Sequence, residues 1–176
     1  MKSMLKCSFV MAFILSMSTA YTQDERKLDY FDAITVTGDV ELVLVQGEEA
    51  RAYITAEGIS EDEVSMYIKG KTLKIQLIEG LFKGDDHVRI EVTYERLRAL
   101  KATAGAMVFS KGAITGDQFD LRASSGAQME LSAEVNTLVA GVSEGAIINM
   151  SGMAETQEIT AATGGQYEGM DFGRLI

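Results

Sequence analysis

The chain has 176 residues, with 16 basic and 26 acidic side chains, 17 glycines, and neither proline nor tryptophan. Its length fits a single domain with a buried core, and the absence of proline suits a fold that needs most backbone N–H groups for strand pairing. The formal charge of −10 disfavours nucleic acids and anionic membrane surfaces as partners, because their phosphate groups would be repelled.

Residues 1–20 have the features of a secretory signal peptide. Two lysines precede an apolar run that ends at Met17, and the small residues Ser18, Thr19 and Ala20 follow. This order predicts cleavage after Ala20. The apolar run is shorter than the roughly 20 residues that span a bilayer, so no stable membrane insertion is expected after cleavage. Without the two lysines, 14 basic and 26 acidic residues remain, a charge of −12, and no cysteine is left for a disulfide.

The first half of the chain that follows the predicted signal peptide has the pattern of short β-strands. Residues 21–29 are polar and are expected to be a loose leader, with one domain over residues 30–176. Up to residue 94, apolar and polar residues alternate with the period of half-buried strands, and turn residues separate the apolar runs. No long segment has helical periodicity, so the sequence predicts an all-β fold. The strands are predicted around residues 34–36, 40–44, 53–54, 64–68, 73–77 and 88–92.

The second half is a repeat with intervals of 21, 19 and 19 residues. A period near 20 with short alternating strands is typical of a solenoid. We therefore expect a parallel β-helix, with the earlier short strands packed on the same core. The two extra residues of the first interval are expected in a turn near residues 116–118. The segments LKATAGAMVFSKG, LRASSGAQMELSA, AGVSEGAIINMSG and ITAATGGQYEGMD centre on Gly105, Gly126, Gly145 and Gly164.

The repeat also predicts which side chains face outward. Residues one and three positions after each glycine should point into a narrow core, and the residues between them should point to solvent. Three apolar residues in the outward rows, Met107, Phe109 and Ile147, are candidates for a contact surface. A further row, Gly112, Ala133 and Gly152, is expected at a corner of the turn.

The stretch GVSEG at residues 141–145 matches the G-x-S-x-G elbow of serine hydrolases. That elbow needs a strand leading into a helix, with a histidine later in the chain, whereas the one histidine, His87, lies upstream of Ser143. The alignment instead places Ser143 in a row with Thr103, Ser124 and Ala162. We therefore expect a structural role for Ser143, and no catalytic residue, no cofactor and no metal ion.

Two other groups of polar residues carry weaker signals. The stretch GDDH at residues 84–87 could hold a metal ion, but a polar hairpin loop is favoured. Glu130 and Glu168 are expected two strands apart, at about 9.6 Å. That distance is at the edge of the range of about 6.5–9.5 Å for inverting glycosidases, although a solvated sheet face is favoured.

Several stretches resemble a known family. They are FDAITVTGDVELVLVQGEEARAYITAEG, GKTLKIQL, HVRIEVTYERLRALKATAGA, SSGAQMEL and SEGAIINMSG. Together they make residues 30–173 similar to the GIN-domain family, the head domain of autotransporter adhesins in bacterial envelope proteins. The resemblance implies secretion, a β-helical fold and no assigned catalytic residue. Because members of that family continue with further glycine-rich turns, additional C-terminal turns are expected to be missing here.

These observations favour an exported, non-enzymatic, adhesin-like protein in the periplasm, on the cell surface or outside the cell. Its expected partner is a surface ligand, either a glycan or a protein. End-to-end self-association is also expected, since the last turn would leave backbone groups unpaired. The alternative is a carbohydrate-active enzyme, a lyase or glycosidase on a β-helix scaffold.

The signal peptide leads to a first prediction. Exported protein should begin at Tyr21, because cleavage is expected after Ala20. N-terminal sequencing of the protein recovered outside the cytoplasm measures this directly. Intact Met1 on soluble protein in the cytoplasmic fraction would contradict it.

Overall fold

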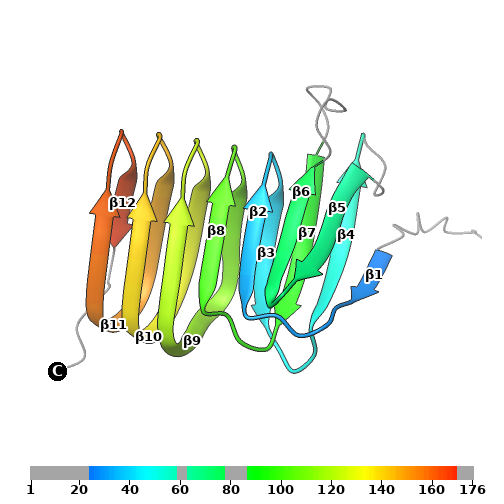
Figure 1. Ribbon diagram of the computed structural model, residues 1–176, viewed down its shortest axis with the longest axis horizontal. Coiled ribbons are helices and arrows are strands. Elements are labelled where there is room, and N and C mark those ends of the chain that lie inside the picture. The colour runs from blue at the N-terminus through cyan, green and yellow to red at the C-terminus, as the bar shows by residue number, and fades with distance from the viewer. Residues whose placement is uncertain (1–23, 59–62, 78–86, 170–176) are drawn as a thin grey trace, which may run out of the picture.

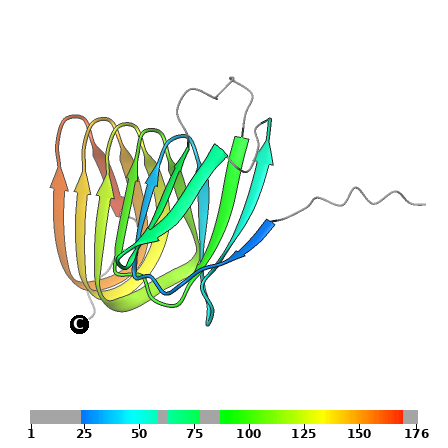
Figure 2. The ribbon, with the colours of Figure 1, turned by 45° about the vertical axis from the view of Figure 1, so that its right-hand side comes forward.

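The computed structural model describes residues 24–58, 63–77 and 87–169. The predicted signal peptide and its cleavage site, together with Asp85 and Asp86, lie outside these ranges. The described chain is all-β, as predicted, and its strands form one sheet that curls like half of a barrel (Figures 1 and 2). All six short strands predicted before residue 94 are present. The strands are β1 (Asp24–Lys27), β2 (Ala33–Thr37), β3 (Glu41–Gln46), β4 (Arg51–Glu57), β5 (Val64–Lys69), β6 (Thr72–Leu77), β7 (His87–Tyr94), β8 (Ala99–Thr103), β9 (Met107–Ala123), β10 (Gln128–Val142), β11 (Ile147–Ala161) and β12 (Gln166–Gly169).

The curl places the strands in two halves that are joined by the long strands β9 to β11. The first part of β9 pairs with β3, and its last part pairs with β8. We call the side with β1, β4, β7, β3 and the first parts of the long strands the β3 half-sheet. The side with β5, β6, β2, β8 and the last parts of the long strands is the β2 half-sheet. Figure 1 shows the two halves as two layers.

Within each half-sheet, neighbours in space are distant in sequence. Strand β3 lies between β7 and β9, so Leu42 pairs with both Ile90 and Val108. Strand β2 lies in the same way between β6 and β8. These pairings are parallel, whereas β1, β4 and β5 join the sheet antiparallel at its other end. The first half of the chain therefore belongs to the same sheet as the repeat.

The core lies between the two half-sheets and is built by the predicted alternation. Ala106, Ala127 and Ala146 are fully buried, and so are Val108 and Ile148, three positions after their glycines. Each large aliphatic side chain buried in this way contributes about 1.5–3 kcal/mol to folding. The inward rows of the repeat are thus confirmed. The largest buried side chains are Phe31, Ile34, Leu42, Leu44, Ile54, Leu73, Ile75, Ile90, Leu100, Ile114, Phe119 and Leu121.

The extra residues of the first repeat interval lie in a β-bulge, and the predicted turn near residues 116–118 is wrong. Phe109 pairs with Glu130 but Ala113 pairs with Ser132, so the offset falls from 21 to 19 residues between them. Gly112 allows the bulge because its φ is 111°, which side chains disfavour. The Ser110 hydroxyl accepts a 2.9 Å hydrogen bond from the backbone N–H of Ser132.

The bulge also corrects the predicted corner row. Ala133 pairs with Ile114 on one side and with Gly152 on the other, so Gly112 is out of line with them. A Cβ at Gly152 would come within 2.0 Å of the Ala133 carbonyl oxygen, so crowding does explain that glycine. A Cβ at Gly112 would meet no atom within 4 Å, so only the positive φ, which Gly152 shares, accounts for the glycine at position 112.

The repeat glycines close tight turns at the top of the two half-sheets. Each follows another residue with positive φ, a combination typical of type I′ turns. At Gly145 the φ is 73° and at the preceding Glu144 it is 54°. The backbone N–H of Ala146 then donates to the Ser143 carbonyl at 3.1 Å, closing the turn. The equivalent pairs are Ala104 and Gly105, Ser125 and Gly126, and Thr163 and Gly164.

The polar segment at residues 21–29 is more ordered than expected. Its residues 24–27 form β1, which pairs antiparallel with β4. The guanidinium of Arg51 lies 3.5 Å from the Glu25 carboxylate, and a hydrogen bond to Tyr53 raises the pKa of Arg51. The prediction of a loose leader is therefore wrong for this part, because backbone pairing to an available sheet edge does not need apolar side chains.

The turns lead to a second prediction. Replacing Gly145 with Val should lower the free energy of unfolding by about 1–2 kcal/mol, because a β-branched residue is strained at positive φ. Glu144→Gly should raise the free energy of unfolding by up to about 1 kcal/mol by removing the strain already present. Urea unfolding of the purified protein measures both changes.

Gly116 provides the matched control. It has no positive φ and open space around it, so Gly116→Val should be neutral or slightly stabilising. Equal unfolding free energies for Gly145→Val and Gly116→Val would contradict the turn assignment.

Candidate functional site

The predicted contact residues lie on the outer face of the β3 half-sheet. Met107 and Phe109 are two positions apart on β9 and share this face. Ile147 is in the same row as Met107, with Gln128 between them, so the two lie about 9.6 Å apart at the strand spacing. All three side chains are partly exposed. The structure therefore brings Met107 and Phe109 together, and it places Ile147 at one side of that pair.

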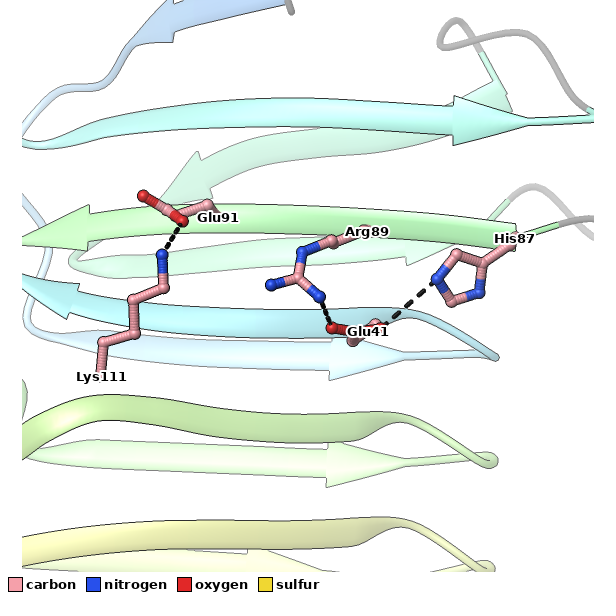
Figure 3. Close-up of polar contacts among 5 residues, drawn as sticks. All are labelled: Glu41, His87, Arg89, Glu91 and Lys111. Atoms are coloured by element: carbon pink, nitrogen blue, oxygen red, sulfur yellow. Dashed lines mark hydrogen bonds and ion pairs between the residues drawn. The ribbon is translucent and has the colours of Figure 1, made fainter.

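Ion pairs lie close to these residues in the sheet, between side chains of β3, β7 and β9 (Figure 3). The Glu41 carboxylate, next to Met107 in the sheet, accepts from Arg89 and lies 3.4 Å from Nε2 of His87. The ammonium group of Lys111 lies 2.6 Å from the Glu91 carboxylate. Such exposed pairs each contribute only about 0–1 kcal/mol to stability. Their main effect is to hold charged groups in fixed positions around the apolar pair.

Lys111 reaches Glu91 by crossing a strand. It lies in the bulge of β9, Glu91 lies on β7, and β3 runs between those strands. Val43, in the row that joins Glu91 to Phe109, points to the outer face and is only 3% exposed. The bulge thus provides a cation that bridges two strands of the outer face. Sequence reasoning missed this cluster because β7, β3 and β9 become neighbours only through long-range pairing.

Ser143 is a ladder residue beside a turn. Its backbone N–H donates to the Ala123 carbonyl at 3.0 Å, and in the same row the Ser124 hydroxyl donates to Thr103 at 3.3 Å. The turn leads into strand β11, whereas a nucleophile elbow leads into a helix. His87 pairs with Glu41 on β3, and both β3 and β9 separate its strand from β10. The geometry does not assemble a nucleophile and base at Ser143.

The glycine that starts the GVSEG match has a separate structural reason. Gly141 pairs with Arg122 on β9 and with Thr160 on β11, and Arg122 pairs with Lys101 on β8. A Cβ at Gly141 would lie 2.5 Å from Nη1 of Arg122, so the guanidinium lies over this glycine. The predicted row of Lys101, Arg122, Gly141 and Thr160 is thus confirmed.

The carboxylates considered for glycosidase chemistry lie where the repeat predicted. Glu130 pairs with Asn149, which pairs with Glu168, so the two carboxylates are two strands apart. They line a hollow of about 290 Å³, but both side chains are exposed. Both carboxylates are therefore in contact with solvent, as expected for a solvated sheet face.

The residues that the structure describes contain neither a candidate metal site nor a candidate membrane-spanning helix. There, no three side chains of His, Cys, Asp or Glu come together in a way that could hold a metal ion. Of the GDDH stretch only His87 is described, and it forms the ion pair with Glu41. Residues 24–58, 63–77 and 87–169 also contain no helix long and apolar enough to cross a membrane.

Comparison with known proteins identifies one matching family model. It is described as "Putative auto-transporter adhesin, head GIN domain", and it matches residues 30–173. These are the boundaries that the sequence resemblance predicted. No curated protein matches the sequence.

Solved structures from two Parabacteroides species share the fold. A protein titled "putative adhesin" from Parabacteroides merdae has a TM-score of 0.65 and 19% identity, over 84% of this chain and 76% of its own. A second "putative adhesin", from Parabacteroides distasonis, has a TM-score of 0.60 and 17% identity, over 80% and 69%. A "putative lipid binding protein" from Parabacteroides distasonis has a TM-score of 0.58 and 13% identity, over 78% and 72%. At these identities the likeness establishes the fold alone.

The position of Ser143 leads to a third prediction. Ser143→Ala should change the free energy of unfolding by at most about 1 kcal/mol, because one hydroxyl hydrogen bond contributes little in net terms. The wild-type protein should also remain unlabelled by a fluorophosphonate probe, since no base activates the hydroxyl. Urea unfolding and mass spectrometry measure the two outcomes. Labelling that disappears in Ser143→Ala would restore the hydrolase interpretation.

Proposed function

Because the chain belongs to the auto-transporter adhesin head GIN-domain family, we propose that it is an exported, non-enzymatic binding protein of the cell envelope or its surroundings. It would bind a surface ligand, a protein or a glycan, through the outer faces of its curled sheet. The family match supports an adhesin-like role and an exported location. The positions of Met107 and Phe109 on the outer face of the β3 half-sheet support the choice of contact surface.

The observation that carries the proposal is the arrangement around Met107 and Phe109. Two apolar side chains stand side by side on an outer face, and the ion pairs of Glu41 and of Lys111 border them. An apolar centre with a charged rim is the usual anatomy of a protein-binding surface. Aromatic residues such as Phe109 are enriched at the centre of such surfaces.

We further propose that the repeat is a short parallel β-helix. The parallel pairing of β10 with β11, which keeps an offset of 19 residues from Gln128 to Val142, supports this. The pairing of β11 with β12 keeps the same offset. A backbone held by such ladders presents its outer rows in fixed positions, which reduces the entropy that binding would cost.

The proposal leads to a fourth prediction. Residues 21–176, applied to a glycan array and to an envelope extract, should retain a specific partner and leave it chemically unchanged. Phe109→Ala combined with Met107→Ala should weaken that binding at least tenfold, as for residues at the centre of an interface. Binding constants come from biolayer interferometry on the partner recovered.

Tyr67→Ala is the matched control, because Tyr67 is 45% exposed but lies on β5 in the other half-sheet. It should leave the affinity unchanged. Cleavage of a retained glycan would instead favour the carbohydrate-active enzyme, and retention on lipid vesicles alone would favour a role like that named for the third structural neighbour.

A further inference from the structure

A groove crosses the outer face of the β2 half-sheet, opposite the face of Met107 and Phe109. One hollow of about 510 Å³ lies over β8 to β11, and a second of about 340 Å³ lies over β2, β6, β8 and β9. Both are lined by Lys101 and Arg122, so the two hollows adjoin each other at these side chains. The groove therefore runs across the strands, along the direction in which the turns stack.

Small residues make this groove. Gly141 leaves the space over β10 open, and the Arg122 guanidinium lies in part of that space. On either side the lining is formed by Ser124, Ser143 and Thr160, whose side chains are short. The lining has no exposed large apolar side chain of the kind that dominates protein interfaces.

Two cations of the groove, Lys101 and Arg122, belong to one outward row, which Lys74 extends beyond the lining of the two hollows. Strand pairing places Lys74, Thr35, Lys101 and Arg122 on four successive strands. Lys101 and Arg122 are on adjacent strands, about 4.8 Å apart at the backbone. Lys74 is two strands from Lys101 on the other side. This row therefore carries positive charge, although the formal net charge of the whole chain is −10.

The neighbouring carboxylates only partly neutralise this row. Asp120 lies 3.4 Å from the Arg122 guanidinium, and Gln118 also donates to Asp120 at 3.1 Å. Arg98, at the edge of the second hollow, pairs with Asp32 at 3.2 Å. Lys101 is exposed and has no ion-pair partner within residues 24–58, 63–77 and 87–169. One cation therefore remains available, and the Arg122 guanidinium retains donors beyond those facing Asp120.

Hydroxyl groups stand beside the cations. Ser124 and Ser143 occupy the row next to Lys101 and Arg122, and Thr160 follows in the row of Gly141. Hydroxyls both donate and accept hydrogen bonds, which matches the hydroxyl groups of a sugar chain. Ammonium and guanidinium groups bind carboxylates with charge-assisted hydrogen bonds, which are stronger than neutral ones.

We propose that this groove binds an acidic polysaccharide, with the sugar chain lying across the strands and its carboxylates at Lys101 and Arg122. Adjacent cations and hydroxyls suit a polymer that carries both carboxylate and hydroxyl groups, and an acidic polypeptide of glutamates lacks the hydroxyl groups. This site is distinct from the contact surface of the proposed function and would operate on the opposite face of the same protein.

The test measures binding of residues 21–176 to polygalacturonate by isothermal titration calorimetry. Binding is expected at low salt and should weaken as salt rises, because exposed charges are screened. Fully methyl-esterified polygalacturonate, which lacks the charges, and polyglutamate, which lacks the sugars, should each bind at least tenfold more weakly. Equal binding of either polymer would overturn the proposal.

Variants test the cations and the shape of the groove separately. Lys101→Gln combined with Arg122→Gln should weaken binding at least tenfold. The control, Lys27→Gln with Lys69→Gln, makes the same charge change at exposed lysines on β1 and β5 and should leave the affinity within about twofold. Equal losses of affinity in the two double variants would mean that the overall charge of the protein, and not the groove, is responsible for polygalacturonate binding.

Gly141→Val fills the groove without changing any charge. Gly141 has no positive φ, and its Cβ would displace the flexible Arg122 side chain, which lies at 2.5 Å (Nη1) and 3.1 Å (Cδ), so the variant should keep its melting temperature while Arg122 moves out of the groove. Its affinity for polygalacturonate should fall at least tenfold. A folded Gly141→Val that binds like wild type would overturn the proposal.

Phe109→Ala should leave polygalacturonate binding unchanged. This result would separate the two proposals. Polygalacturonate binding tests the groove, and partner binding that depends on Phe109 tests the contact surface.

Discussion

The fold depends on a tight turn that recurs in each repeat and on the parallel pairing that follows it. Two successive residues with positive φ reverse the chain at the top of the sheet, as at Glu144 and Gly145. The backbone N–H of Gly126 donates to the Glu144 carbonyl at 3.0 Å, so adjacent turns are also bonded to each other. Because each turn is fixed on its neighbour, the strands below it have one register, and a slip by one residue would expose the whole inward row.

That register determines what each face of the sheet can do. Inward rows alternate small and larger side chains, which fill the narrow space between the half-sheets. Outward rows are free of this packing constraint, so the bulge after Phe109 directs Lys111 across β3 to Glu91 and leaves the core rows intact. On the other half-sheet, the missing side chain at Gly141 opens a groove that cations and hydroxyls line. Rigid rows of this kind suit recognition, since binding requires little ordering of the backbone.

Much of this protein follows from local sequence patterns. The alternation of apolar residues determined the all-β class and the short strands, since strand side chains point to opposite faces with a period of two. The repeat interval determined the turn glycines, the inward alanines and the row that holds Gly141, because parallel strands in register bring equivalent residues together. The structural role of Ser143 followed from the same alignment.

Only the tertiary structure decided how the first half joins the repeat. Strand β3 enters between β7 and β9, and no local pattern encodes which strand edges meet over such distances in the chain. This long-range pairing creates the Glu41, His87 and Arg89 cluster and places Lys74 in line with Lys101. The bulge was also hidden, because a glycine in a bulge and a glycine in a turn look alike in sequence, and both have positive φ here. The pairing of β1 was missed because it depends on backbone groups that meet the edge of β4, and its polar side chains show no apolar alternation that would indicate a strand.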